Sequence, residues 1–300
     1  MNSTSITKNT SSIKSIITDV KQLVKVGLSL SVVFSSVAGY LLAVETVNYM
    51  MLILLAVGGF LMVAASNAFN QIIEIDTDAL MQRTKNRPLP TGRMSVNTAL
   101  IIAILFAILG LSILYYINAK SALFGAISIF LYTSAYTPLK SVTPLTVFVG
   151  AIPGAIPFML GWVAATNQFG IEAGILFMIQ FFWQFPHFWS IGWLQDEEYK
   201  KAGFNMLPMN TKDTGAVKQI IFYTVIMIVV SIAPVLKVTG NFYIYPATAI
   251  IVALLGCLML YYAVQLYKTL HNTEARKLML ASVLYITLVQ IIYVIDKFLH

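Results

Sequence analysis

The sequence has 300 residues, of which 58% are hydrophobic and only 10% are charged, and its formal net charge is +7. Soluble globular proteins carry about a quarter charged residues, so this composition excludes an ordinary soluble domain and indicates a chain that resides in the lipid bilayer. The single cysteine, Cys257, excludes a disulfide framework or a thiolate metal cluster within one chain.

The N-terminal segment is polar. Residues 1–20 are rich in Ser and Thr and lack the apolar core of a signal peptide. We therefore expect residues 1–20 to form a disordered cytoplasmic tail, and residues 21–300 to form one transmembrane domain.

Nine apolar runs follow, each near the length of about 20 residues that a helix needs to cross a bilayer. They are too long for barrel strands and lack alternation, so they predict an all-α membrane protein with nine transmembrane helices. The runs cover approximately 28–44, 49–69, 97–117, 121–137, 145–165, 173–193, 219–236, 244–267 and 278–296.

The cationic residues predict the orientation of these helices. With the N-terminus in the cytoplasm, 16 of the 19 Lys and Arg residues fall on the inner side, which is a strong positive-inside bias. The net positive charge is therefore a feature of topology, and we expect no nucleic-acid partner.

An acidic cluster lies at the inner end of the second span, in Asn70–Asp78. At about 100° per residue, Asn70, Glu74 and Asp78 share one stripe of a regular helix, whereas Asp76 points elsewhere. An amide oxygen and two carboxylates suit Mg²⁺, so these three residues are candidate metal ligands. The alternative is a solvated acidic helix end.

Cations follow this cluster at Arg83, Lys85 and Arg87, and then Pro88 and Pro90 indicate a loop. A diphosphate held by Mg²⁺ exposes further anionic oxygens, which Arg and Lys side chains bind. The sequence therefore predicts a diphosphate site. The alternative is that the cations serve topology alone.

A second acidic cluster, Asp196–Lys201, lies at the inner end of the sixth span and thus on the same side of the membrane. Asp196 and Glu198 are candidate ligands of a second Mg²⁺, and Lys200 and Lys201 are candidate diphosphate contacts. Spacing alone does not decide which acid faces the metal, and a plain hydrophilic loop is the alternative.

Two further stretches carry polar or small residues. In the sixth span, Pro186 is expected to kink or break the helix, and Gln184 and His187 are candidate pocket residues. The short inner loop after the fourth span carries Lys140 as its only cation, a further candidate diphosphate contact. Gly150 and Gly154, after that loop, predict close helix packing.

Three blocks, Asn70–Arg93, Tyr136–Gly161 and Trp183–Leu207, together resemble the UbiA superfamily of intramembrane prenyltransferases. The stretches Tyr-Thr-Pro-Leu-Lys and Pro-His-Phe-Trp resemble the branch that farnesylates haem. Glu74 stands where Asp is usual, and Ser141 and Thr146 replace the usual Arg and Asn.

The resemblance implies a UbiA-type bundle, Mg²⁺ as cofactor, farnesyl diphosphate and haem B as substrates, and a prokaryotic plasma membrane with the active site on the cytoplasmic face. It implies a downstream partner in haem A synthesis or terminal oxidase assembly. The implied catalytic residues are Asn70, Asp78, Arg83 and Lys201, and the implied haem contacts are Tyr136, Trp183, Gln184 and His187.

The residues alone leave the acceptor open. A UbiA-type enzyme with an aromatic or quinone-precursor acceptor is one alternative. An ion-coupled transporter is another, although transporter sites lie near the bilayer midplane, whereas the acids here cluster at one face.

Overall fold

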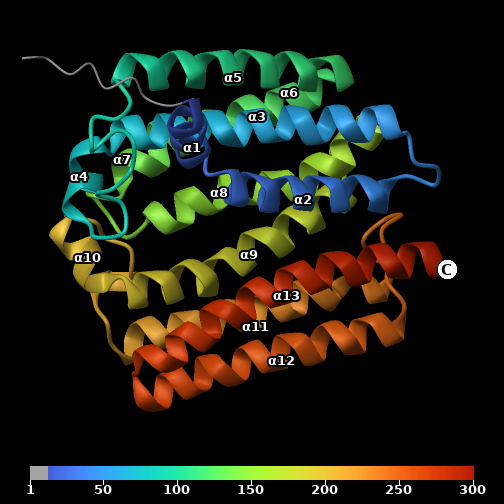
Figure 1. Ribbon diagram of the computed structural model, residues 1–300. Helices are drawn as coiled ribbons and strands as arrows, with labels where there is room; N and C mark the ends of the chain where they lie inside the picture. Colours follow the sequence, from blue (N-terminus) through green and yellow to red (C-terminus); the bar gives the residue numbers. More distant parts are fainter. Residues whose placement is uncertain (1–12) are drawn as a thin grey trace, which may run out of the picture.

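The computed structural model describes residues 13–300, and helices dominate this range (Figure 1). Nine long helical segments run back and forth within it, each within a few residues of a predicted span. They are α2 (Val26–Ala43), α3 (Tyr49–Ile73), α5 (Val96–Ile117), α6 (Ala119–Phe130), α8 (Thr146–Thr166), α9 (Ile171–Leu194), α11 (Thr214–Ile232), α12 (Pro246–Thr269) and α13 (Asn272–Leu299). The predicted all-α class is confirmed.

Eight helices are long and apolar enough to cross a membrane, when α6 is counted together with η1 and α7 (Ala119–Leu139) and α11 together with η3 (Thr214–Leu236). The chain is therefore an integral, multi-pass membrane protein. The ninth segment, α9, carries Gln180, Gln184 and His187. It packs between α8, α11 and α13, so it contacts protein on several sides and needs less apolar surface than α5 or α12. The count of nine spans and the cytoplasmic N-terminus stay predictions.

The N-terminal segment differs from the expected disordered tail. A helix, α1 (Ile13–Leu23), covers its second half, with Leu23 buried and Ile16 and Ile17 half exposed. The expectation of disorder is therefore wrong for residues 13–20, because an amphipathic helix can bury one face on the bundle. The rest of the expected tail, residues 1–12, lies outside the described residues.

Short elements gather at one end of the bundle, on the left of Figure 1. They are α4 (Ile75–Leu80), a π-helical turn η1 (Leu131–Tyr136), α7 (Thr137–Leu139), α10 (Asp196–Lys201) and the 3₁₀ turn η2 (Pro208–Asn210). The remaining 3₁₀ turn, η3 (Ala233–Leu236), extends α11. The C-terminus lies at the opposite end.

Side-chain caps set the first turns of several long helices. The side chains of Asn48, Ser95, Asn118 and Asp213 accept hydrogen bonds from the backbone N–H three residues on. Such a cap satisfies a backbone N–H that the helix itself leaves without a partner. These polar residues therefore mark where α3, α5, α6 and α11 begin.

Small residues let α2 and α8 cross closely. A methyl group at Gly161 would lie 2.0 Å from the carbonyl oxygen of Ser36, and one at Gly39 would lie 2.0 Å from that of Phe158. The predicted tight packing at Gly154 is confirmed, because a methyl group there would meet the Gln184 amide oxygen at 2.0 Å. Small residues at a helix interface let the two backbones approach closely, and the resulting van der Waals packing favours helix association in a bilayer.

We expect Gly161→Ala to destabilise the protein by about 1–3 kcal/mol, because the added methyl group forces two backbones apart. Gly174→Ala is the matched control, since nothing lies within 4 Å of a methyl group at that helical position. Thermal unfolding in detergent would compare the two variants, and equal midpoints would contradict this account of the crossing.

Candidate functional site

Three chain segments meet at the end of the bundle that carries α4, α7 and α10 (Figure 1). The backbone N–H of Gln82, after α4, donates to Glu198 Oε2 of α10 at 2.6 Å. The backbone N–H of Asn205 donates to the carbonyl oxygen of Lys140 at 2.7 Å. The two acidic clusters predicted to share one side of the membrane therefore lie together in space.

The first cluster keeps the predicted stripe although the helix changes at its centre. Helix α3 ends at Ile73 and α4 begins at Ile75, with Glu74 between them at φ −97° and ψ 17°. The N–H of Asp78 still donates to the Glu74 carbonyl at 2.7 Å. Asn70, Glu74 and Asp78 are buried, whereas Asp76 is exposed, as the helical spacing predicted.

Asn70 is positioned by the segment that follows α6. Its amide Nδ2 donates to the Thr137 hydroxyl at 3.2 Å, and Thr137 in turn donates to the Tyr132 carbonyl at 2.7 Å. The π-helical turn η1 brings Thr137 to this place, and such turns are frequent at functional sites. The amide oxygen of Asn70 is an acceptor, so it can take a hydrogen bond or bind a cation.

Glu74 forms a buried ion pair with Lys140. Their charged atoms are 2.7 Å apart, and both residues are less than 9% exposed. The Lys140 ammonium also lies 4.6 Å from the ring centre of Tyr136 and 5.6 Å from that of Phe204. Aromatic faces attract a cation, so carboxylate and rings together hold this ammonium group in place.

Asp78 pairs with Arg87 at 2.5 Å and is only 1% exposed. Burial raises the pKa of Asp78 above its ordinary value, and the neighbouring Arg87 opposes that rise. The second carboxylate oxygen, Oδ1, is buried and has no partner among the described residues. An unsatisfied buried acceptor costs about 1–3 kcal/mol, so Oδ1 points to a ligand that completes the site.

The oxygen atoms of Asn70, Glu74 and Asp78 are of the type that Mg²⁺ prefers as ligands. Mg²⁺ needs only one or two carboxylates, because it keeps several waters and substrate phosphate oxygens as its other ligands. Asn70, Glu74 and Asp78 supply hard oxygen atoms, and one of these oxygens has no partner. In residues 13–300, however, no three His, Cys, Asp or Glu side chains gather into a ready cage, and Glu74 and Asp78 pair with cations.

The second cluster is more exposed than the first. In α10, Lys200 pairs with Asp196 at 2.8 Å and Lys201 with Glu198 at 2.9 Å, and both lysine side chains are 59% exposed. Glu198 is the acid of this cluster that contacts the segment after α4, by accepting from the backbone N–H of Gln82. The hydrogen bond from Lys201 lowers the pKa of Glu198, and the N–H of Gln82 acts in the same direction.

Lys25 belongs to this site, although the sequence showed it only as one inner cation among many. It lies between α1 and α2 with a left-handed backbone, φ 46°. Burial lowers its pKa to about 7; Arg87 and Lys140 nearby lower it further, and Glu74 and Asp78 oppose them. Only the fold reveals this position, because Lys25 is 45 residues from Asn70 in the chain.

A cationic groove of about 590 Å³ lies beside Lys25. Lys21 and Lys25 line it from one side, and the exposed Arg83 and half-buried Arg87 line it from the loop after α4. Lys85, also in this loop, is exposed. Four cations around one groove make it suited to an anion with several charges.

The four predicted haem contacts do not form one cluster. Tyr136 lies at the acidic site beneath Lys140. Gln184 faces α8, where its amide donates to the Ala151 carbonyl at 2.9 Å. Trp183 and His187 stack on each other at 4.6 Å and face α13, where Trp183 donates to the Ser282 carbonyl and His187 Nδ1 lies 2.8 Å from the Ser282 hydroxyl.

Three sequence features near these residues have structural roles. Pro186 does not break α9, which runs through it. Thr146 is buried and donates to the Tyr136 carbonyl at 3.0 Å, so it supports the turn that carries Tyr136. Ser141 donates to the Pro138 carbonyl at 3.2 Å and stabilises the loop beside Lys140.

The chain matches the model of the UbiA prenyltransferase family over residues 32–288. It is 62% identical over 291 residues to the protoheme IX farnesyltransferase of Flavobacterium psychrophilum, covering 96% of this chain and 97% of that protein. It is 61% identical to the protoheme IX farnesyltransferase of Flavobacterium johnsoniae, covering 98% of this chain and 99% of that protein.

Solved structures share the fold. A structure of digeranylgeranylglyceryl phosphate synthase aligns with a TM-score of 0.78 at 20% identity, over 94% of this chain and 99% of that one. A UbiA homologue from Archaeoglobus fulgidus, bound to GPP and Mg²⁺, aligns with a TM-score of 0.63 at 17% identity. The alignment covers 92% of this chain and 99% of that one. At these identities the likeness concerns the arrangement of helices.

Proposed function

The chain belongs to the UbiA prenyltransferase family, and we propose that it transfers the farnesyl group of farnesyl diphosphate to a vinyl group of haem B, giving haem O and diphosphate. One observation carries the choice of acceptor: identity above 60% along nearly the whole chain to proteins named protoheme IX farnesyltransferase. The site at the end of the bundle supports the choice of a prenyl diphosphate as the donor, because buried carboxylates lie there beside a groove rich in cations.

The diphosphate binds among Lys25, Arg87 and Lys140, and Arg83 and Lys85 of the loop after α4 approach it from solvent. Lys25 has its pKa lowered to about 7 by burial and nearby cations, and an arriving anion would favour its charged form. Lys200 and Lys201 contact the diphosphate only if they leave Asp196 and Glu198, to which they are now paired.

Asn70, Glu74 and Asp78 would hold Mg²⁺ on one side of the diphosphate, with Asp196 and Glu198 of α10 opposite. The bound GPP and Mg²⁺ of the Archaeoglobus fulgidus homologue support this choice of ion. When bound, Mg²⁺ offsets the negative charge that develops on the leaving diphosphate. Lys140 and Arg87, now paired with Glu74 and Asp78, are placed to take the phosphate oxygens instead.

The reaction is an electrophilic alkylation. The bond between the farnesyl C1 carbon and the diphosphate oxygen breaks, and the bonding electrons leave with diphosphate. A vinyl carbon of haem attacks the allylic cation, and water adds to the resulting cation and loses a proton, which gives a hydroxyethylfarnesyl side chain. Tyr136 and Phe204 place aromatic faces at this end of the bundle, where they can stabilise a cation.

Trp183 and His187 present a stacked pair at α9, held by Ser282 of α13, and remain our candidates for haem contacts. Gln184 acts indirectly, by fixing α9 against α8. We place the active site on the cytoplasmic face of a prokaryotic plasma membrane, with haem A synthesis or terminal oxidase assembly downstream.

The purified protein in detergent, given farnesyl diphosphate and haem B, should form haem O and release diphosphate. Removal of divalent ions with EDTA should abolish product, and added Mg²⁺ should restore it. Replacing haem B with 4-hydroxybenzoate should give no prenylated product; prenylated 4-hydroxybenzoate would favour the aromatic-acceptor alternative. Turnover in detergent without an ion gradient would exclude a transporter.

A further inference from the structure

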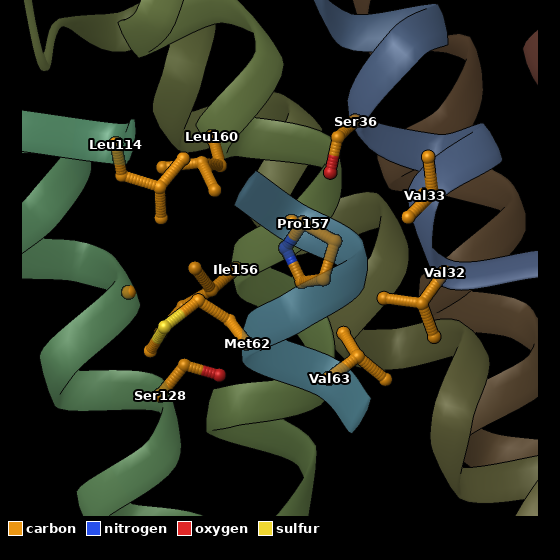
Figure 2. A pocket seen from close by; sticks show the side chains of 12 residues that line it. Val32, Val33, Ser36, Met62, Val63, Leu114, Ser128, Ile156, Pro157 and Leu160 are labelled. Atoms are coloured by element: carbon orange, nitrogen blue, oxygen red, sulfur yellow. The ribbon is translucent and has the colours of Figure 1, made fainter. Parts of the chain in front are cut away.

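A small cavity inside the bundle lies between α2, α3, α5, α6 and α8, and none of the residues that line it belongs to the acidic site. Its volume is about 30 Å³, which is room for about two water-sized groups. Figure 2 shows mostly apolar side chains around it, among them Met62, Ile156 and Leu160. This cavity is a packing gap, whereas the groove of about 590 Å³ beside Lys25 has room for a substrate group with several charges.

Two parts of the chain form the walls of this groove. Helix α1 and the first turn of α2 supply one wall, and the loop after α4 supplies the other. The cations are Lys21 and Lys25 on the first wall and Arg83 and Arg87 on the second. Like charges on facing walls repel each other, and Lys25 shows the effect, since its pKa is lowered by burial and also by Arg87. An empty groove therefore tends to widen unless a contact holds its walls together.

Arg93 provides such a contact, although it does not itself line the groove. One of its nitrogens, Nη2, donates to the side-chain oxygen of Gln22 at 3.2 Å and to the backbone carbonyl of Asn86 at 3.0 Å. Gln22 belongs to the first wall and Asn86 to the second. A single guanidinium nitrogen therefore bridges the two walls.

The other nitrogens of Arg93 hold the guanidinium group in place. Its Nε donates to Asp19 Oδ1 of α1 at 2.9 Å in an ion pair, and its Nη1 donates to the Thr91 hydroxyl at 2.9 Å. Asp19 is only 8% exposed, and a buried carboxylate is costly without a charged partner. Arg93 thus uses four of the five N–H groups that a guanidinium carries in a fixed fork.

Other contacts attach α1 to the bundle independently of Arg93. Leu23 of α1 is fully buried and packs with Leu89 and Met94 of the loop after α4, in a small apolar cluster separate from the main core. The side-chain amide of Gln71, on α3, donates to the Leu23 carbonyl at 2.6 Å. These contacts would keep α1 on the bundle in a variant of Arg93, so Arg93 serves the spacing of the walls.

Building on the proposed function, we propose that Arg93 is a positioning residue that fixes the separation of the two groove walls, so that cations from both walls meet one diphosphate group. A groove that is already arranged binds its ligand without the cost of ordering its walls. Arg93 acts through Gln22, Asn86 and Asp19, to which its guanidinium is bonded. Its loss should therefore weaken donor binding and leave the chemical step largely unchanged.

Arg93→Gln is expected to raise KM for farnesyl diphosphate about 10-fold and to change kcat by less than about 3-fold. The Kd of inorganic diphosphate with Mg²⁺, measured by isothermal titration calorimetry in detergent, should rise by a similar factor. KM for haem B should stay constant, because the groove binds the donor in our proposal. KM and Kd do not depend on the fraction of folded protein, so poor folding of the variant does not obscure the result.

Arg93→Lys separates geometry from charge. Lysine keeps the positive charge, but its ammonium donates from one atom and cannot reproduce the contacts that three guanidinium nitrogens make. KM for farnesyl diphosphate should therefore stay close to that of Arg93→Gln. Asp19→Asn should raise KM as well, and adding it to Arg93→Gln should bring little further change, because the two residues act as a unit.

Arg276→Gln is the matched control, because Arg276 is an exposed cation in the first turns of α13 and does not line the groove. Its KM and Kd should equal those of wild type. Wild-type values in Arg93→Gln, their return in Arg93→Lys, or an equal rise in Arg276→Gln would overturn the proposal. Failure of the wild-type protein to prenylate haem B would instead contradict the proposed function. The Kd of inorganic diphosphate would still test Arg93 in that case, so the two failures are distinguishable.

Discussion

Asp78→Asn is expected to lower kcat/KM for prenyl transfer by about 100- to 1000-fold, the usual effect of removing one group that stabilises charge in a transition state. The substitution keeps the size of the side chain but removes the charge that pairs with Arg87 at 2.5 Å. It also replaces a buried carboxylate whose Oδ1 has no partner in the described part of the chain. In our proposal the Asp78 carboxylate would bind Mg²⁺, and Mg²⁺ would offset the charge of the leaving diphosphate.

Asp76→Asn is the matched control, because Asp76 lies two residues away in the same short helix and is exposed. Haem O formation measured against Mg²⁺ concentration would distinguish the two variants. We expect Asp78→Asn to need far more Mg²⁺ or to lose activity altogether, and Asp76→Asn to resemble wild type. Equal Mg²⁺ curves for wild type and Asp78→Asn would remove Asp78 from the metal site.

Asp76 and Asp78 also show why much of this site was predictable from the sequence. Helical spacing separates a buried stripe through Asn70, Glu74 and Asp78 from the exposed Asp76, and local backbone geometry maintains that separation even where α3 gives way to α4. The all-α fold and family membership were predictable for a similar reason: apolar run length and short motifs are local properties of a chain.

Partners across the bundle were not predictable in this way. The pairing of Glu74 with Lys140 joins residues 66 positions apart, and Gln82 meets Glu198 across 116 positions. Lys25 enters the site only because α1 and α2 are placed beside the loop after α4. Spacing in the sequence predicts faces of one helix, whereas these contacts depend on how separate helices pack.

The predicted haem contacts show the same limit within one helix. Trp183, Gln184 and His187 lie within five residues, yet Gln184 bonds to α8 while Trp183 and His187 face α13. Neighbouring residues on a helix point about 100° apart, so proximity in sequence does not place them in one pocket. The buried α9 meets protein on several sides, which separates its polar residues further.

Lys140→Met is expected to reduce the free energy of unfolding by about 3–5 kcal/mol, because it leaves the Glu74 carboxylate buried without its partner. Both members of this pair are less than 9% exposed and lie 2.7 Å apart. Lys277→Met is the matched control: its ion pair with Glu274 has the same kind of partner at 2.8 Å, but the lysine side chain is 49% exposed. Lys277→Met should therefore reduce the free energy of unfolding by less than about 1 kcal/mol.

Glu74→Gln added to Lys140→Met separates the structural role of the pair from its chemical role. Neutralising both partners removes the unpaired buried charge, so the double variant should regain most of the stability lost in Lys140→Met. Prenyl transfer should not return, because the double variant lacks both the Glu74 carboxylate offered to Mg²⁺ and the Lys140 ammonium offered to the diphosphate. Denaturant unfolding in mixed micelles and haem O formation would be measured on the same preparations. Recovery of activity together with stability would mean that Glu74 and Lys140 support the fold of the site but do not bind its substrate.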